Sequence, residues 1–497
     1  MAIREVTAEN GKLLGAPSGI PSTTVFRGIP YAAPPVGELR WKPPAPAADW
    51  EGVRVAHSFA KVAMQLPGPE MLAKENMEYP EPMDEDCLYL NIWTPAKSAD
   101  ERLPVLLWIH GGAFFAGHSY GTHVDGDYLA EKGIILVSIA YRLGVFGFMC
   151  HPELSAENGG SSGNYGILDQ ICALKWVRRN ISAFGGDPDK ITIAGQSAGA
   201  SSVQTIISSP LSEGDLFGAV MMSGPAARNL DFIAPGTLAE AEDFGIRLLK
   251  ELNISSVAQA RAVGGQEFMD MAAAAARNIT GPFGMPFKPV VDGRVLKKSQ
   301  AECAFSGDIP DINYMVGHTD EGLLDPPVST MAGYERWIAA KFKDRAEEAK
   351  AAFSIKNEAD LAALRPDTIK TALIAAAHSF CRRNDTLGKK PAYYYHFQHK
   401  LPGDELGAFH GGELWYFFNK LNRCWRPFTS FDHELARICA GYLANFVKTG
   451  NPNGEGLPRW EADTNALQST MRLQNPVYCC HAPNNAGVEY MIKSSTG

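Results

Sequence analysis

Short, continuous apolar runs recur along the first half of the chain and alternate with a helical pattern. Three of them contain almost no polar residue, at positions 105–109, 134–139 and 219–222. Such a run is typical of a strand buried on both faces of a parallel sheet. Between the second and third runs, apolar residues recur at helical spacing over 166–181. The alternation predicts an α/β fold with a mostly parallel central sheet flanked by helices.

A fourth apolar run, at 191–194, leads into a candidate nucleophile. Gly195-Gln-Ser-Ala-Gly199 follows it directly, and apolar residues at helical spacing continue from Ala200 until Pro210. A strand that enters a helix through a tight turn between glycines exposes the serine of that turn, Ser197, at the edge of the sheet. Its hydroxyl becomes a nucleophile when a base and anion-stabilising donors reach it.

The same glycine–serine pattern occurs at two other serines, Ser119 and Ser161. Ser161 follows a loop-like sequence instead of a strand. Ser119 is followed by Gly126, which would break a helix in its first turn. The structural context therefore favours Ser197 as the nucleophile.

Two consecutive glycines follow the run at 105–109, in His110-Gly-Gly. Glycines directly after a buried strand let the backbone aim successive N–H groups at one spot, which is what an oxyanion hole requires. A glycine turn that only reverses the chain is the alternative interpretation.

Candidates for a catalytic acid and base lie after Ser197. Helical patterns over 238–278, 330–353 and 358–383 are interrupted by predicted strands at 314–317 and 393–397. Asp320 and Glu321 follow the first of these strands, although a solvated loop carboxylate is an alternative for either. His410 lies in a glycine-flanked loop, and spacing alone leaves His433 and His481 open.

Composition narrows the range of partners. The formal net charge is −9, and no basic block interrupts the sequence. Nucleic acids and anionic membrane surfaces require clustered Lys and Arg, so both are excluded as expected partners. No apolar run approaches the ~18 residues that a membrane span needs.

The cysteines and the first residues of the chain indicate the cellular compartment of the protein. The nine cysteines include no C-x-x-C pair, so we expect reduced thiols, with neither a disulfide framework nor a metal site. Residues 1–12 lack the apolar stretch of a secretory signal. We therefore expect a cytoplasmic protein, while a removed signal stays open. We expect a single domain over residues 1–497 and no cofactor, and the oligomeric state stays open.

A series of motifs in order resembles the type-B carboxylesterase family, which contains carboxylesterases and cholinesterases on the α/β-hydrolase fold. The resemblance extends from about residue 5 to about residue 485. The motifs are Phe26-Arg-Gly-Ile-Pro-Tyr-Ala, Glu85-Asp-Cys-Leu-Tyr-Leu-Asn91, His110-Gly-Gly, Tyr141-Arg-Leu-Gly144, Gly163-Asn-Tyr-Gly-Ile-Leu-Asp-Gln170, Phe184-Gly-Gly-Asp-Pro188, Gly195-Gln-Ser-Ala-Gly199, Phe287-Lys-Pro-Val-Val-Asp-Gly293 and Thr449-Gly-Asn-Pro-Asn453. It implies an α/β-hydrolase fold with large helical insertions over the active site.

The resemblance also implies roles for individual residues. Ser197 would be the nucleophile, Glu321 the acid and His410 the base. The backbone N–H groups of the oxyanion hole would belong to Gly111, Gly112 and Ala198. Two structural ion pairs are implied as well, Arg40 with Glu85 and Arg142 with Asp169.

This chain departs from the family pattern at three places. Met64 stands where secreted members have a cysteine that pairs with the one matching Cys87. Gln196 replaces the glutamate usual before the serine, which removes a negative charge beside the nucleophile. Residues 61–84 contain no tryptophan for a choline-binding platform. A cholinesterase is therefore disfavoured.

The expected function is a serine carboxylesterase that hydrolyses small carboxylic esters through an acyl-enzyme. A hydrolase of amides, lactones or multi-ester natural products is the alternative, and a non-catalytic binding protein of the same fold is a further one. The candidates for the wall of the substrate pocket are Phe114, Phe115, Gln196, Phe283 and Phe287.

Overall fold

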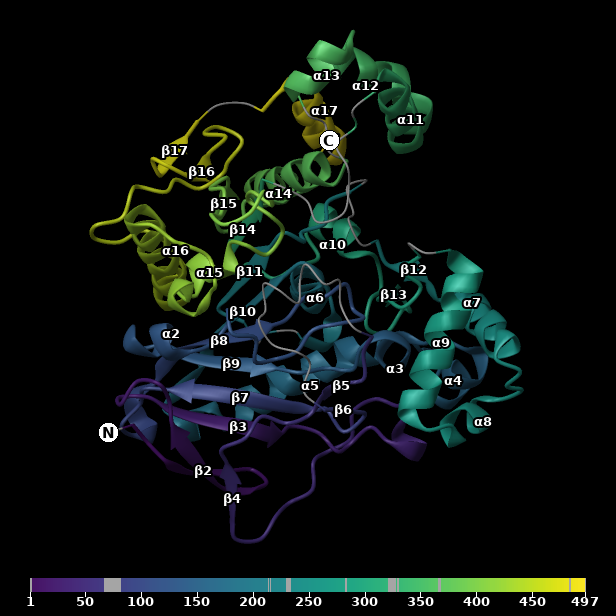
Figure 1. The fold of residues 1–497 in the computed structure, drawn as a ribbon, viewed down its shortest axis with the longest axis vertical. Coiled ribbons are helices and arrows are strands. Elements are labelled where there is room, and N and C mark those ends of the chain that lie inside the picture. Colours follow the sequence, from purple (N-terminus) through teal and green to yellow (C-terminus); the bar gives the residue numbers. More distant parts are fainter. Residues whose placement is uncertain are drawn as a thin grey trace.

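One sheet of thirteen strands organises the part of the chain that the computed structural model describes, which is residues 2–66, 82–212, 214, 216–228, 234–281, 284–320, 328, 330–364, 368–481 and 484–496 (Figure 1). The strand order is β1-β2-β3-β7-β9-β8-β10-β11-β14-β15-β16-β17, and β4 pairs with β2. The bounds are β1 (Glu5–Ala8), β2 (Gly11–Pro17), β3 (Thr24–Pro30), β4 (Val53–Ala56), β7 (Tyr89–Thr94), β8 (Leu103–Ile109), β9 (Ile135–Ile139), β10 (Gly186–Gln196), β11 (Gly218–Met222), β14 (Asn313–Thr319), β15 (Ala392–Phe397), β16 (Thr470–Leu473) and β17 (Tyr478–Cys480). Two separate strand pairs are β5 (Val62–Ala63) with β6 (Met83–Asp84) and β12 (Gly236–Thr237) with β13 (Val290–Val291).

The middle of the sheet is parallel, as the apolar runs predict. Every pairing from β9 through β8, β10, β11, β14 and β15 to β16 is parallel. At the edges, β17 pairs antiparallel with β16, and β1, β2, β3 and β7 continue the sheet beyond β9 in antiparallel pairs. The prediction of a mostly parallel α/β sheet is confirmed.

Strand register brings the ends of four strands to one place. Gly195 of β10 lies opposite Ile109 of β8 and Met221 of β11. Met222 in turn lies opposite Gly317 of β14. Because these strands are parallel, the segments that leave their carboxyl ends share one edge of the sheet, where ligand sites form in α/β proteins.

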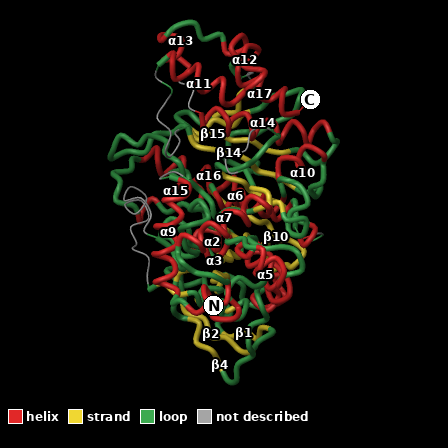
Figure 2. The backbone as a smooth tube through the Cα atoms, turned by 90° about the vertical axis from the view of Figure 1, so that its right-hand side faces the viewer, coloured by secondary structure: helices red, strands yellow, loops and turns green. Residues whose placement is uncertain are grey.

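Helices flank both faces of the sheet (Figure 2). Alternate residues of β8 point to opposite sides, so Leu107 packs with one core cluster and Trp108 with another. Helices that contribute to the Leu107 cluster include α5 (Tyr165–Asn180), α6 (Ala198–Ile207), α10 (Gln300–Ser306) and α14 (Thr368–Thr386). Those that contribute to the Trp108 cluster are α2 (Asp127–Glu131), α15 (Leu414–Phe417) and α16 (Ser430–Thr449).

Two further groups of helices lie beside the sheet (Figure 1). One packs in its own apolar cluster and contains α3 (Gly144–Phe148), α4 (Pro152–Glu157), α7 (Leu238–Glu251), α8 (Val257–Ala262) and α9 (Gly265–Thr280). The other contains α11 (Met331–Phe342), α12 (Ala346–Phe353), α13 (Glu358–Leu364) and α17 (Ala486–Thr496), which pack with α14. The short 3₁₀ segments are η1 (Gly37–Leu39), η2 (Ala99–Glu101), η3 (Ile181–Phe184), η4 (Pro210–Ser212), η5 (Lys343–Arg345) and η6 (Leu421–Arg423). Among the described residues, no helix combines the length and the apolar character needed to cross a bilayer.

Both ion pairs implied by the family resemblance are present, that of Arg142 with Asp169 buried and that of Arg40 with Glu85 partly buried. Arg142 Nη2 lies 2.6 Å from Asp169 Oδ1, and its Nε donates to Oδ2 of the same carboxylate at 2.8 Å. Arg40 makes the same two-pronged contact with Glu85 and also donates to the Ala260 carbonyl of α8. Removing one partner of such a pair leaves a buried charge uncompensated, so the pairs fix loops around the sheet.

All nine cysteine side chains are free thiols in this structure. Cys87, whose counterpart in secreted relatives would form a disulfide, is buried in the main core, and this burial raises the pKa of its thiol well above the usual range. Met64, at the place of the missing partner, packs in the cluster around α7 and α9 instead.

Candidate active site

Ser197 occupies a strained turn between β10 and α6. Its φ is +58° and its ψ is −124°, a conformation that costs energy for a residue other than glycine. The flanking glycines are required by close backbone approach, because a Cβ on Gly199 would lie 2.2 Å from the Ile109 carbonyl oxygen. The Ser197 backbone N–H donates to Met222 O at 2.8 Å, which ties the turn to the end of β11.

The other two serines in the same sequence pattern have structural bonds in loops. Ser161 Oγ donates to Asp292 Oδ2 at 2.6 Å. Ser119 Oγ accepts a hydrogen bond from Asn91 Nδ2 at 3.1 Å. Neither serine joins a strand to a helix, in line with the sequence-based choice of Ser197.

The segment after β8, residues 110–117, lies against Ser197, the candidate nucleophile; we call it the oxyanion loop after its predicted role. A Cβ placed on Gly111 would lie 3.2 Å from Ser197 Cβ and 2.5 Å from the Gln196 carbonyl oxygen, so this approach is open only to glycine. The loop then turns through positive φ at Gly112 (+103°), Ala113 (+51°) and Phe114 (+64°). Backbone bent in this way can aim several N–H groups at one point beside Ser197.

His410 lies next to Gln196, the residue that precedes the candidate nucleophile Ser197. Its Nε2 is 3.2 Å from Nε2 of Gln196. The ring is 8% exposed, and this burial lowers the pKa of His410 to about 4. The structure therefore holds His410 as a neutral imidazole, the form in which a histidine accepts a proton.

The competing histidines lie elsewhere or are committed to other partners. His433 on α16 and His481 after β17 are exposed, and His481 Nδ1 lies 3.0 Å from Ser469 Oγ. His378 within α14 pairs with Asp463 at 2.6 Å, and His396 on β15 pairs with Asp320 at 2.8 Å. His410 therefore remains the base candidate, in contact with Gln196, the residue before Ser197.

Two carboxylates were predicted as candidates for the acid, and the structure describes only one of them, Asp320. Asp320 directly follows β14 and is engaged by the His396 ring, and its backbone N–H donates to Phe397 O at 2.8 Å. Glu321 lies outside the described residues, so its role stays a prediction. The carboxyl end of β14, from which both residues follow, is at the same sheet edge as Ser197.

A further carboxylate, Glu413, was not singled out by the sequence reasoning. It lies three positions after His410, is fully buried, and accepts a hydrogen bond from Ser223 Oγ at 3.2 Å. Desolvation raises its pKa from the ordinary 4.5 to about 7. Ser223 follows β11 directly, so Glu413 ties the His410 loop to the strand beside β10. Its only sequence signal was its place in the Phe-His-Gly-Gly-Glu-Leu stretch around His410.

Comparison with known proteins gives the family. The family model described as "Carboxylesterase family" matches residues 3–490. The chain belongs to this family. It is 35% identical to the fumonisin B1 esterase of Sphingopyxis macrogoltabida, over 82% of this chain and 74% of that protein. It is 33% identical to the para-nitrobenzyl esterase of Bacillus subtilis (strain 168), over 95% of each chain.

A solved structure agrees with this assignment. A PNB esterase superposes with a TM-score of 0.83 at 29% sequence identity, over 98% of this chain and 99% of that chain. The expected α/β-hydrolase fold is therefore confirmed, and the protein is a serine-type carboxylic-ester hydrolase. The non-catalytic binding protein considered from sequence is not supported.

The suggested pocket residues of this carboxylesterase fall in different environments. Phe114 is fully buried and packs on Phe148, with ring centroids 5.1 Å apart. Phe115 is 40% exposed, and Phe287 packs edge-on against Phe244. Phe283 lies outside the described residues. Gln196 is the member of this set that contacts His410, and the wall as a whole stays a prediction.

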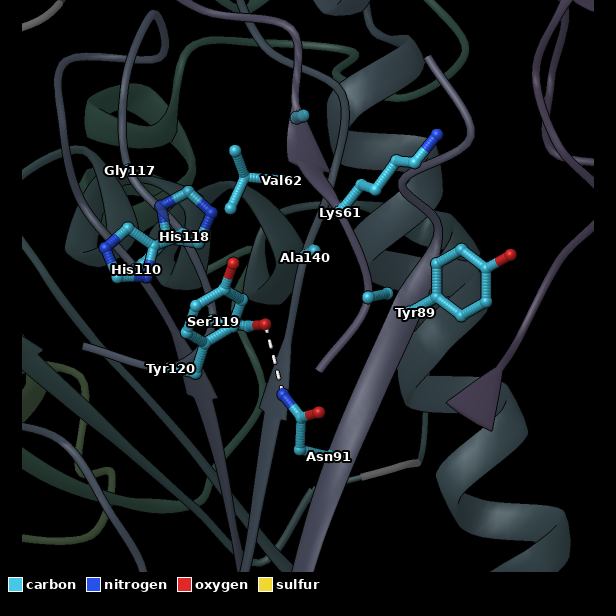
Figure 3. Close-up of a pocket in the computed structure, with 12 residues that line it drawn as sticks. Lys61, Val62, Tyr89, Asn91, His110, Gly117, His118, Ser119, Tyr120 and Ala140 are labelled. Carbon is cyan, nitrogen blue, oxygen red and sulfur yellow. Dashed lines mark hydrogen bonds between the residues drawn. The ribbon is translucent and has the colours of Figure 1, made fainter. Parts of the chain in front are cut away.

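A narrow pocket lies behind the oxyanion loop of the carboxylesterase (Figure 3). Its volume is about 10 Å³, which is roughly the room that one water molecule needs. The rings of His110 and His118 lie together on one side, and Asn91 reaches Ser119 across the floor (Figure 3). Burial lowers the pKa of His110 to about 3 and that of His118 to about 4. This pocket therefore supports the loop with two neutral histidines and is too small for an ester.

The buried carboxyl of Glu413 gives a prediction for stability against pH. The folded protein keeps this proton up to about pH 7, whereas the unfolded chain releases it near 4.5. Its contribution is thus fully present below pH 4.5 and lost as the pH rises through 7. We expect the free energy of unfolding of Glu413→Gln, relative to wild type, to rise by about 2–3 kcal/mol between pH 5 and pH 8.5. Urea midpoints of both proteins at the two pH values measure it, and a difference that does not change with pH would contradict it.

Proposed function

We propose that this carboxylesterase hydrolyses its substrate with Ser197 as nucleophile, His410 as general base and Glu321 as the acid that orients the imidazole. The N–H groups of Gly111, Gly112 and Ala198 would form the oxyanion hole. Two observations around the turn carry the proposal: the glycine-only approach of Gly111 to Ser197, and the contact of the neutral His410 with Gln196, the residue before Ser197. These parts come from segments that follow β8, β10 and β15.

The proposed chemistry proceeds in two halves. His410 takes the proton of Ser197 as the hydroxyl attacks the ester carbonyl, and Glu321 stabilises the imidazolium that forms. The oxyanion of the tetrahedral intermediate accepts hydrogen bonds from the loop N–H groups and from Ala198 at the start of α6. The imidazolium then protonates the leaving alcohol, and the acyl-enzyme is cleared by a water that the same base activates.

The substrate we propose is a small carboxylic ester without a required positive charge. Gln196 supplies an amide where a carboxylate would attract a cation, and it lies within contact of His410. The relatives named for para-nitrobenzyl and fumonisin B1 esters support esters in general. The fumonisin relative also keeps a multi-ester natural product as the second candidate. The nine free thiols support a reducing compartment such as the cytoplasm.

Labelling by a fluorophosphonate, followed by peptide mapping, tests the nucleophile directly. One covalent adduct is expected, on the peptide that contains Ser197. A panel of p-nitrophenyl esters of graded acyl length, with mono-p-nitrophenyl succinate and a matched p-nitroanilide, then tests the substrate class. Ester turnover should exceed anilide turnover in every matched pair. An adduct on another serine, or faster anilide cleavage, would overturn the proposal.

A further inference from the structure

Gln65, just after β5, forms hydrogen bonds with the backbone at the far end of the oxyanion loop. Its Nε2 donates to the Gly117 carbonyl oxygen at 2.9 Å, and the Gly117 N–H donates to its Oε1 at 2.8 Å. The second hydrogen of Nε2 goes to Ala63 O at 3.0 Å. The side chain is buried, and both amide hydrogens and its oxygen are used. This pattern fixes the orientation of the amide, because the two carbonyls accept only from nitrogen.

The loop that Gln65 holds is strained at Ala113 and Phe114, which have positive φ without being glycine. Gly112 and Gly117 (φ +115°) also have positive φ, which glycine adopts without strain. Non-glycine backbone of this kind persists only where surrounding contacts over-determine it. The middle of the loop is held by the Gly144 N–H, which donates to Phe114 O at 2.7 Å. The two hydrogen bonds between Gln65 and Gly117 hold the end of the loop.

Gly117 packs directly on the residues at the start of the loop. A Cβ at this position would lie 2.3 Å from His110 Nδ1 and 2.6 Å from the Gly111 carbonyl oxygen, and His110 Nδ1 itself lies 2.8 Å from that oxygen. Figure 3 places Gly117 beside the His110 ring. Gly111 in turn lies so near Ser197 that a Cβ on it would be 3.2 Å from Ser197 Cβ. Contacts therefore run from Gln65 through Gly117 to Gly111, without Gln65 reaching the reacting atoms.

We propose that Gln65 is a positioning residue for the oxyanion hole, acting through Gly117 to hold the N–H groups of Gly111 and Gly112 where the oxyanion forms. This inference rests on the proposed function. Without the two bonds, the Gly117 peptide can rotate and the packed Gly111 carbonyl follows, which turns the adjoining N–H groups away from the oxyanion. Small displacements of this kind cost about 10²-fold in rate, and loss of one donor costs roughly 10²–10³-fold.

The test replaces Gln65 by methionine, which keeps the length and removes both bonds, and by glutamate, which keeps the acceptor for the Gly117 N–H. The matched control is Asn164→Leu, since Asn164 is also buried and grips the backbone of Val290 in the same two-bond manner, at 2.9 and 3.0 Å. All variants are compared with wild type in melting temperature, kcat, KM and affinity for a trifluoromethyl ketone, whose adduct places an oxyanion in the hole.

For Gln65→Met we expect a kcat lower by about 10–100-fold, with KM changed less than threefold. Affinity for the trifluoromethyl ketone should fall by the same factor as kcat/KM. Gln65→Glu should lose less kcat and less ketone affinity than Gln65→Met. If Gln65→Met does not fold, Gln65→Glu is the variant that tests the inference. Asn164→Leu should lower the melting temperature and leave kcat within about twofold.

A folded Gln65→Met or Gln65→Glu variant with wild-type kcat and ketone affinity would overturn the inference and leave a structural role only. If Asn164→Leu lost as much kcat as Gln65→Met, the inference would also be overturned. Failure of the proposed function looks different, because Ser197→Ala would then retain the turnover of the wild type.

Discussion

Replacing Ser197 by alanine is expected to lower kcat for a short-chain p-nitrophenyl ester by on the order of 10⁴-fold or more. Alanine keeps the Cβ but lacks the hydroxyl that would form the acyl-enzyme. Substrate binding and the oxyanion-hole donors should persist, so the residual rate should come from these alone. Steady-state kinetics, combined with the loss of fluorophosphonate labelling, measure the effect.

Ser161→Ala is the matched control for this experiment. Ser161 stands in the same glycine–serine sequence pattern, but its hydroxyl bonds to Asp292 in a loop. We expect its turnover to stay within about twofold of wild type, with only a modest change in stability. Retained activity in Ser197→Ala, or abolished activity in a folded Ser161→Ala, would reject the assignment of the nucleophile.

His410→Ala is expected to reduce kcat to a similar extent, by on the order of 10⁴-fold. Without the imidazole, Ser197 has no base to take its proton and the leaving alcohol has no acid to protonate it. The ring packs beside Gln196 at the end of a loop, so its loss should leave the sheet intact. Single-turnover kinetics at neutral pH should show acylation as the step that fails.

His433→Ala separates this explanation from a general effect of removing a histidine. The sequence left His433 open as the base, and the structure places it on the exposed side of α16. Its replacement should leave kcat unchanged. An inactive His433→Ala together with an active His410→Ala would mean that the base is misassigned.

The sequence predicted the parallel part of the fold because its signals were local. Continuous apolar runs marked β8, β9 and β11, and helical spacing marked α5 to within a residue at each end. The edge strands β1, β2 and β4 were not predicted, since short strands with one exposed face, such as β1, carry a weaker pattern. The helices beyond residue 230 were predicted as a region, and the structure divides 238–278 into α7, α8 and α9.

At the site, the sequence context was enough to select Ser197 as the candidate nucleophile. It did not point to Glu413 or Gln65, whose roles depend on contacts that exist only in the folded protein. Burial raises the pKa of Glu413, and its partner Ser223 lies 190 positions away in the chain. The grip of Gln65 on Gly117 joins residues 52 positions apart. No periodicity encodes such pairs, because each depends on where two loops meet once the sheet has formed. Glu321 rests on its place after β14 and on the family pattern.

Because the central strands run in the same direction, the two rims of the sheet differ in their use for protein engineering. Each residue of the proposed catalytic machinery follows the carboxyl end of a central strand, so among the described residues the opposite rim, including the exposed stretch around η2 ahead of β8 and residues 388–390 ahead of β15, contributes none of them. Affinity tags, surface-immobilisation handles or a fused partner grafted onto that rim would leave the entrance for esters unobstructed.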